Sequence, residues 1–229
     1  MEKERWNKDI INNKKIQKIL DVFYPQICGI CEKENKNSLC YECRKKIQKE
    51  FKFSKIYSKT QNFSEQYYLF HYKNLIRNII IEMKFQKKPY MYKTIEYFLQ
   101  NNKKYLEKLK KYDIIIMVPL SWKRRLQRGY NQSQLIAKII SNILQRKIES
   151  KILYKTKNIV PQSTLNKKER KENIKGAFKI KHTEKIKNKK ILIIDDIYTT
   201  GSTLNECARL LIRNGIKKED IGVLTLAKD

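Results

Sequence analysis

The sequence predicts an α/β fold, in which helices cover both faces of a parallel sheet, preceded by a small module built on four cysteines. Two short β-branched apolar runs, residues 113–118 and 191–194, have the composition of buried parallel strands. Segments of helical periodicity separate these runs, and this alternation is typical of a parallel sheet covered by helices. Four of the five cysteines lie between Cys28 and Cys43. The 229 residues suffice for one ordinary domain plus a small appendage.

We expect the first 60 residues to hold a helical lead and the cysteine module. Residues 1–23 place apolar side chains at helical spacing. No apolar run approaches the ~20 residues that a helix needs to cross a bilayer. The first 13 residues are polar and carry no apolar signal segment, so we expect a cytoplasmic protein without a membrane span. Residues 52–61 are polar and predict a linker before the second domain.

The second domain, residues 61–229, is predicted to hold the sheet. The predicted strands are residues 67–72, 113–118, 191–194 and 221–226. The predicted helices are residues 75–85, 94–109, 132–144 and 204–213, the last ended by Asn214 and Gly215. Residues 155–175 are highly charged and lack periodicity, so they predict a loop or a short helix.

The formal net charge of +29, from 52 basic and 23 acidic residues, favours polyanionic partners such as nucleic acid or phosphorylated metabolites. A competing interpretation is a genome-wide preference for lysine, since solvated lysines need no partner. Arginine is scarce, yet three arginines lie between Arg124 and Arg128. Because the planar guanidinium matches phosphate oxygens better than an ammonium does, this cluster predicts a site rather than a solvated face.

The cysteines follow the pattern C-x2-C-x8-C-x2-C, and the four residues are Cys28, Cys31, Cys40 and Cys43. Each pair can turn back onto one ion, and we expect Gly29 to relieve the first turn. Four thiolates predict a structural Zn²⁺ without an open coordination position. An iron–sulfur cluster with the same ligands and a redox dithiol remain alternatives. Cys207 is predicted to be a small core residue in the middle of a helix.

The segment I-L-I-I-D-D-I-Y-T-T-G-S-T-L, residues 191–204, predicts a phosphate site after a buried strand. The strand is expected to end at Asp195 and Asp196, whose carboxylates would accept hydrogen bonds from sugar hydroxyls or help to hold Mg²⁺. The loop that follows would surround a phosphate with amides and hydroxyls at a helix N-terminus. The predicted phosphate-binding residues are Thr199, Thr200, Gly201, Ser202 and Thr203. The alternative is a polar turn with threonine caps.

The whole segment resembles the phosphoribosyltransferase signature, in which apolar residues precede [D/E]-D, three residues and T-G-[G/S]-T. The resemblance implies a type I phosphoribosyltransferase-like sheet. It also implies that Asp195 and Asp196 contact the ribose hydroxyls of phosphoribosyl pyrophosphate (PRPP), and that Thr199 to Thr203 hold its 5-phosphate.

Two further segments narrow the resemblance: V-P-L-S-W-K-R-R-L-Q-R-G-Y-N-Q, residues 118–132, and P-Q-S-T-L-N-K-K-E-R-K-E-N-I-K-G-A-F, residues 161–178. Together with the cysteine module, they resemble the ComF family of competence-associated phosphoribosyltransferase-like proteins. The matching positions are Arg124, Arg128, Gly129, Asn131, Gln132, Gln162, Leu165, Arg170, Asn173, Gly176, Ala177 and Phe178. The chain departs from the family at Tyr130, where Phe is frequent, and at Ser121-Trp122, where His-Pro is expected.

In a phosphoribosyltransferase, a nucleophile attacks C1 of the ribose as pyrophosphate leaves. Arg124 and Arg128 follow a predicted strand and are expected to bind that pyrophosphate, while residues 155–175 would close as a lid. No acceptor can be predicted, and His71 and His182 are expected to be packing or surface residues.

Two classes of function therefore stay open. One is a transferase with an unknown acceptor that acts in DNA uptake beside other competence proteins. The other is a non-catalytic competence factor that holds the backbone of single-stranded DNA with its phosphate loop and basic surface. A regulatory PRPP sensor is a third.

Overall fold

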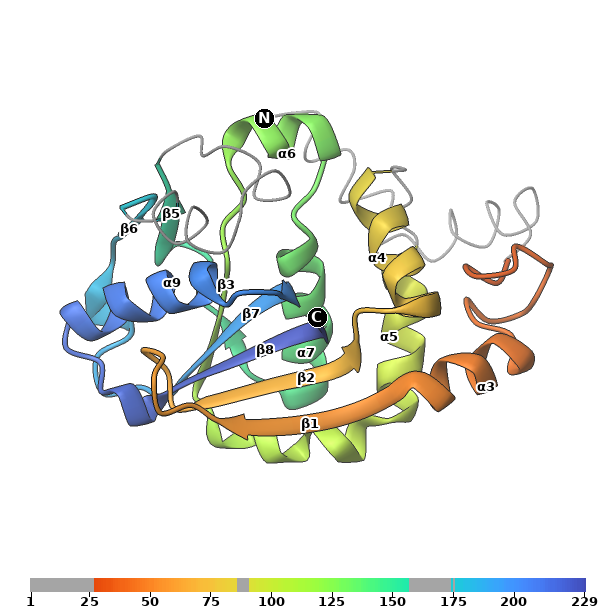
Figure 1. The fold of residues 1–229 in the computed structure, drawn as a ribbon, viewed down its shortest axis with the longest axis horizontal. Coiled ribbons are helices and arrows are strands. Elements are labelled where there is room, and N and C mark those ends of the chain that lie inside the picture. The colour runs from red at the N-terminus through yellow and green to blue at the C-terminus, as the bar shows by residue number, and fades with distance from the viewer. Residues whose placement is uncertain (1–26, 86–90, 157–173, 175) are drawn as a thin grey trace.

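A six-stranded sheet with the strand order β1-β2-β8-β7-β3-β4 forms the centre of the protein (Figure 1). The computed structural model describes residues 27–85, 91–156, 174 and 176–229. The strands are β1 Phe51–Tyr57, β2 Glu65–His71, β3 Ile114–Met117, β4 Lys147–Ile148, β7 Ile191–Tyr198 and β8 Ile221–Lys228. Strand β1 runs antiparallel to β2, and the other neighbouring pairs are parallel. A second, two-stranded antiparallel sheet pairs β5 Leu153–Lys155 with β6 Phe178–Ile180.

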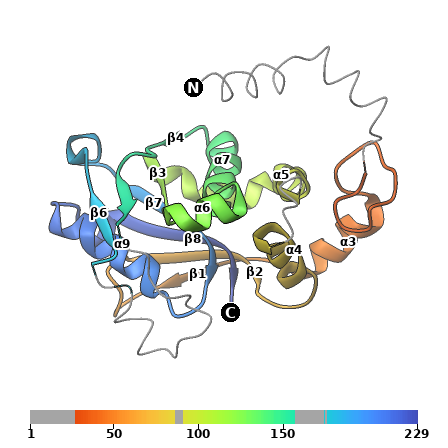
Figure 2. The same ribbon diagram turned by 90° about the horizontal axis from the view of Figure 1, so that it is seen from above.

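Helices cover both faces of the large sheet. The α-helices are α3 Tyr41–Glu50, α4 Asn74–Phe85, α5 Met91–Asn101, α6 Trp122–Arg128, α7 Gln132–Leu144 and α9 Ser202–Arg213. The 3-10 helices are η1 Lys103–Lys111, η3 Thr183–Lys185 and η4 Lys218–Asp220. Figure 2 shows α5 and α7 on one side of the sheet and α9 on the other. None of the helices in the described ranges is long and apolar enough to cross a membrane.

Each face of the sheet has its own apolar cluster. Along β7, Leu192 and Ile194 belong to the cluster beneath α4, α5 and α7, whereas Ile191 and Ile193 belong to the cluster beneath α9. Because successive side chains of a strand point to opposite faces, a strand buried on both faces must be apolar at every position. This packing confirms the predicted α/β fold with a mostly parallel sheet.

The structure corrects three local predictions. Residues 52–61 are not a linker, because residues 51–57 form β1, whose Phe51 ring lies 5.5 Å from that of Phe70 on β2. Strand β7 does not end at the two aspartates but pairs with β8 as far as Tyr198. The predicted helix over residues 94–109 is divided, because Asn102 donates from its side chain to the carbonyl of Phe98 and ends α5.

Two predictions lie wholly or mostly outside the described residues. These are the helical lead over residues 1–23 and most of the charged segment 155–175. At the N-terminal end of that segment, Lys155 ends β5. The boundary between residues 60 and 61 remains a prediction, although β1 lies before it and belongs to the large sheet.

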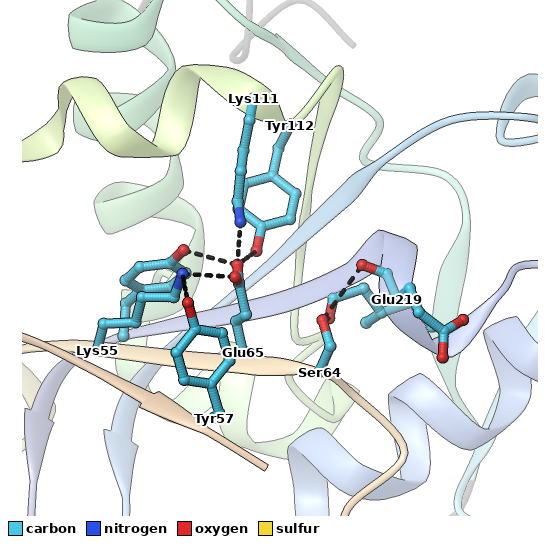
Figure 3. A network of polar contacts seen from close by, with 9 residues as sticks. Lys55, Tyr57, Ser64, Glu65, Lys111, Tyr112 and Glu219 are labelled. Atoms are coloured by element: carbon cyan, nitrogen blue, oxygen red, sulfur yellow. Dashed lines mark hydrogen bonds and ion pairs between the residues drawn. The ribbon is translucent and has the colours of Figure 1, made fainter. Parts of the chain in front are cut away.

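A buried carboxylate, Glu65, ties β1 and β2 to the segment before β3 at the amino end of the parallel strands (Figure 3). The Tyr67 and Tyr112 hydroxyls each donate to Oε2 at 2.7 Å, Lys111 also pairs with this oxygen, and Lys55 lies 2.6 Å from Oε1. Burial alone would raise the pKa of Glu65, but the hydrogen bonds from these four residues outweigh it and lower the pKa to about 2.

Candidate functional site

The predicted phosphate loop, acidic pair and arginines all line one cavity of about 680 Å³. The cavity opens at the carboxyl ends of β3 and β7, where parallel α/β sheets place their ligands. The predicted residues on its wall are Arg124, Arg128, Asp195, Asp196, Thr199, Thr200, Gly201, Ser202 and Thr203. Segments that are distant in sequence therefore meet at one site.

The acidic pair lies within β7, and its two carboxylates have different partners. The Ser133 hydroxyl donates to Oδ1 of Asp195 at 2.8 Å, and the backbone N–H of Asp196 donates to the same oxygen at 2.9 Å. Oδ2 of Asp196 lies 2.9 Å from Nζ of Lys84. Burial and the neighbouring charge of Asp196 raise the pKa of Asp195 to about 7. The surroundings of Asp195 therefore favour its protonated form more than water does.

The phosphate loop requires glycine at position 201 for two reasons. Gly201 has φ of 72°, in the left-handed region, and a Cβ atom there would lie 2.2 Å from the Tyr198 hydroxyl oxygen. The loop thus turns tightly over the Tyr198 ring before α9 begins at Ser202. The hydroxyls of Thr200 and Ser202 lie 2.9 Å apart. Hydroxyls and the first N–H groups of the helix therefore lie at one point, as a phosphate site requires.

Two arginines one helical turn apart on α6 line the opposite part of the wall. Nη1 of Arg128 donates to Oε1 of Gln132 at 3.1 Å, and its guanidinium lies over the Phe85 ring at 5.2 Å. Burial lowers the pKa of Arg128. Within the described ranges, neither Arg124 nor Arg128 forms an ion pair with a carboxylate. Uncompensated guanidinium groups in a concave wall favour an anionic ligand.

Several matching positions of the resemblance hold the scaffold of the site. Asn131 donates to the Val118 carbonyl at 3.0 Å and caps α7 by accepting from the Ser133 N–H. Gln132 donates to the Met83 carbonyl, as does the hydroxyl of Tyr130, a position where the family frequently has Phe. These bonds fix the end of α4 against the start of α7.

The remaining matching positions divide into two groups. Ala177 and Phe178 are buried beneath α9, and the Gly176 N–H donates to Glu206 at 3.0 Å. The matching positions between 162 and 173 lie outside the described residues.

Sequence reasoning missed two lysines of the cavity wall, Lys84 and Lys155. Burial and the charge of Arg124 lower the pKa of Lys155 to about 8. No sequence signal separates these two lysines from the many others in the chain. His71 and His182 do not line the cavity; His71 packs on Tyr68 with ring centroids 5.3 Å apart, and His182 lies near the exposed Glu184.

The four predicted metal ligands lie together, with their sulfur atoms within 4.8 Å of one another. Sγ of Cys31 and Sγ of Cys40 are 3.8 Å apart. A tetrahedron with metal–sulfur bonds of about 2.3 Å has sulfur–sulfur edges of about 3.8 Å, so the four cysteines can hold a structural metal ion. Cys40 also caps α3, because its sulfur accepts from the Cys43 N–H.

The cysteine module packs directly on α5. Ser38 Oγ donates to the Lys93 carbonyl at 3.0 Å, and Thr94 Oγ1 donates to the Ser38 carbonyl at 2.9 Å. A Cβ atom on Gly29 would lie 2.1 Å from Thr94 Oγ1, and Gly29 does not have a positive φ. The glycine therefore permits close approach to α5, rather than the turn relief that the sequence predicted. Cys207 is buried on α9, as predicted.

Comparisons with known proteins agree with this geometry. The phosphoribosyl transferase domain family matches residues 131–229. Competence protein F of Haemophilus influenzae is 29% identical over 208 residues, which cover 88% of this chain and 90% of that protein. Competence protein ComFC of Streptococcus pneumoniae is 30% identical over 164 residues, 70% of this chain and 66% of that protein.

The chain belongs to the ComF family. Another relative is the DNA utilization protein YhgH of Escherichia coli, 39% identical over 103 residues. This match covers 45% of the ComF chain described here and 44% of YhgH. The names of these relatives refer to competence and DNA utilization.

Proposed function

We propose that this protein binds PRPP, or another ligand with a ribose 5-phosphate group, in the cavity at the carboxyl edge of the sheet. Residues Thr199 to Thr203 would hold the 5-phosphate, and Asp195 and Asp196 would accept hydrogen bonds from the ribose hydroxyls. The convergence of the phosphate loop, the acidic pair and two arginines on one cavity is the observation that carries the proposal. The matching phosphoribosyl transferase domain supports it.

The same cavity suits the leaving group of a phosphoribosyl transfer. In such a transfer, a nucleophile forms a bond to C1 while the bond between C1 and the pyrophosphate oxygen breaks, and positive charge develops on the ribose ring. Arg124 and Arg128 would bind the departing pyrophosphate. Oxygen ligands are what Mg²⁺ prefers, so the acidic pair fits this ion, which would neutralise charge on the pyrophosphate when bound with it.

We place this activity in DNA uptake during natural transformation, in the cytoplasm and beside other competence proteins. The names of the relatives support this role. The net charge of +29 supports contact with nucleic acid. We also assign the four cysteines to a structural zinc ion, and elemental analysis of purified protein should find one zinc per chain. Iron in its place would show a cluster instead.

One observation favours a second candidate, the non-catalytic binding of single-stranded DNA. Trp122 on α6 is 71% exposed, and Arg124, Arg125 and Arg128 follow it on the same short helix. An exposed indole beside guanidinium groups is typical of surfaces that stack bases and hold a phosphate backbone.

The first experiment is a calorimetric titration with PRPP–Mg²⁺ at fixed ionic strength, with ATP–Mg²⁺ as a polyanionic control. Binding of PRPP well above the control supports the proposal, and equal binding contradicts it. A competition titration with a labelled single strand then compares the two candidates. Displacement by PRPP beyond that by ATP indicates a shared site, whereas equal displacement indicates separate sites. Release of pyrophosphate with a pool of acceptors would show turnover.

A further inference from the structure

One of the two carboxylates proposed to bind the ribose, that of Asp196, already forms an ion pair with a lysine of the same cavity. Nζ of Lys84 lies 2.9 Å from Oδ2 of Asp196, and the two side chains are only 17% and 16% exposed. Both residues line the cavity. An ion pair largely withdrawn from water is costly to break without replacement, because either charge alone is poorly solvated. A ligand whose hydroxyls displace Lys84 from the Asp196 carboxylate must therefore supply another anion that pairs with Lys84.

The backbone beside Lys84 is fixed while its side chain is long. Lys84 belongs to the last turn of α4, and the carbonyl of the preceding Met83 accepts from Gln132 at 3.1 Å and from the Tyr130 hydroxyl. These bonds anchor the end of α4 beside α7. A lysine stem of four methylene groups on a fixed backbone can move its ammonium between neighbouring partners.

The charges on the cavity wall indicate which anion would be the second partner of Lys84. The wall carries four cations, Lys84, Arg124, Arg128 and Lys155, and two carboxylates. Within the described part of the chain, Lys84 is the one cation of the four in an ion pair. The other three already favour an anion, so a pyrophosphate group would offer Lys84 a partner as good as the carboxylate it leaves.

We propose that Lys84 is an exchangeable counter-ion. It pairs with Asp196 when no ligand is bound and moves to the pyrophosphate oxygens of the ligand when ribose hydroxyls take the carboxylate. Lys84 then has an anionic partner, and Asp196 a hydrogen-bond partner, in either state. The inference rests on the proposed function and adds a fourth cation to the pyrophosphate site. It also gives the cavity a means to select PRPP over ribose 5-phosphate, which offers Lys84 no second anion.

The test is the variant Lys84→Met, titrated with PRPP–Mg²⁺ and separately with ribose 5-phosphate. PRPP should bind at least about tenfold more weakly, since a hydrogen bond to a charged group contributes about 1.5–3 kcal/mol. Ribose 5-phosphate should bind equally or more tightly, because Asp196 is freed. The matched control is Arg77→Met, which removes one exposed charge from the same helix and should change neither affinity.

The outcomes separate the two proposals. If the wild-type protein binds neither ligand, the proposed function fails. If it binds both, and Lys84→Met weakens both equally or neither, the exchange is overturned. A second comparison covers loss of fold: magnesium pyrophosphate is titrated against Asp196→Asn with and without Lys84→Met. Exchange predicts that Lys84→Met still weakens pyrophosphate binding when Asp196 is absent, whereas a static counter-ion predicts no effect.

Discussion

Each end of the sheet withdraws a carboxyl group from water, and the pKa values of the two groups shift in opposite directions. At the amino end, Glu65 receives hydrogen bonds or ion pairs from four side chains, and its pKa falls to about 2 (Figure 3). At the carboxyl end, Asp195 accepts from Ser133 and from the Asp196 N–H, and its pKa rises to about 7. Burial raises the pKa of both groups. At Glu65 the hydrogen bonds from two lysines and two tyrosines outweigh burial, whereas at Asp195 the charge of Asp196 adds to it.

This difference distinguishes a structural carboxylate from one available to a ligand. Both carboxylate oxygens of Glu65 already accept hydrogen bonds or ion pairs from side chains of the protein. The acids of β7 instead face a cavity whose wall also carries Lys84, Arg124, Arg128 and Lys155. We therefore expect changes at the amino end to alter stability, and changes at the carboxyl end to alter binding.

The largest expected effect is on binding, in the double variant Asp195→Asn and Asp196→Asn. Affinity for PRPP–Mg²⁺ should fall by at least about 100-fold, since two charge-assisted contacts contribute about 1.5–3 kcal/mol each. The melting temperature should fall less than in Glu65→Gln, because Asp196→Asn leaves one lysine without its carboxylate whereas Glu65→Gln leaves two. Calorimetry and thermal unfolding measure the two quantities, with the exposed Glu219→Gln as a control. Unchanged affinity would refute the assignment of β7 as a ribose site.

The converse variant is Glu65→Gln at the amino end. Removing the carboxylate leaves Lys55 and Lys111 without their partner, so the free energy of unfolding should fall by about 2 kcal/mol. Affinity for PRPP–Mg²⁺ should stay at the wild-type value. Denaturant unfolding and calorimetry on the same sample test both statements. A Glu65→Gln variant that keeps the wild-type stability but no longer binds PRPP–Mg²⁺ would contradict the assignment of Glu65 to stability rather than binding.

The two carboxylates also predict opposite dependences on pH. The pKa of Asp195 is raised from 3.8 to about 7, so its contribution to stability is fully present below pH 3.8 and is lost as the pH rises through 7. The pKa of Glu65 is lowered from 4.5 to about 2, so its contribution is present above pH 4.5 and is lost as the pH falls towards 2.

Thermal unfolding between pH 4 and 8 should therefore show a decline that Asp195→Asn removes and Glu65→Gln does not. PRPP–Mg²⁺ affinity should rise over the same range, because the ionised Asp195 accepts stronger hydrogen bonds from ribose hydroxyls than the protonated form and is the form that binds Mg²⁺. An affinity that falls as Asp195 ionises would contradict this role.

The smallest expected effect concerns two exposed aromatic rings, that of Trp122 at the carboxyl end of the sheet and that of Tyr57 at the amino end. Trp122→Ala should weaken single-stranded DNA binding about fivefold, since one stacked base contributes about 1 kcal/mol or more. The control is Tyr57→Ala, which removes a ring of similar exposure, 72% against 71%, at the amino end. Fluorescence anisotropy with a labelled strand measures both. Equal losses would show that DNA binds by dispersed lysines rather than at the carboxyl edge.

The sequence predicts local features well where one face of an element decides its structure. Helix α7 occupies the predicted residues 132–144, because its apolar periodicity is strong and Asn131 caps it. Strand β1 escaped prediction because four of its seven residues are exposed and its apolar contacts come mainly from one face, through Phe51 and Phe53. The alternation of F-K-F was its one available signal.

Contacts between segments that are distant in the sequence could not be predicted from local sequence patterns. The continuation of β7 to Tyr198 depends on β8, and the carboxylate of Asp196 depends on a lysine at the end of α4. The motif at residues 191–204 predicted the composition of the phosphate site, because the type and order of its residues specify that chemistry. It did not contain the counter-ion or the scaffold at Met83, and it gave no sign that its own Tyr198 lies beneath Gly201, because these contacts come from packing.

The docking of the cysteine module on α5 links metal availability to the fate of the entire chain. Cys28 and Cys43 share one apolar cluster with Ile95 and Phe98 of α5, so a metal ion held by the four cysteines would also stabilise the wall of the domain core. By mass action, an ion bound by the folded state alone stabilises that state in proportion to the logarithm of its free concentration. Chelation should therefore lower the melting temperature of the whole protein, and scarcity of metal would limit how much folded protein persists.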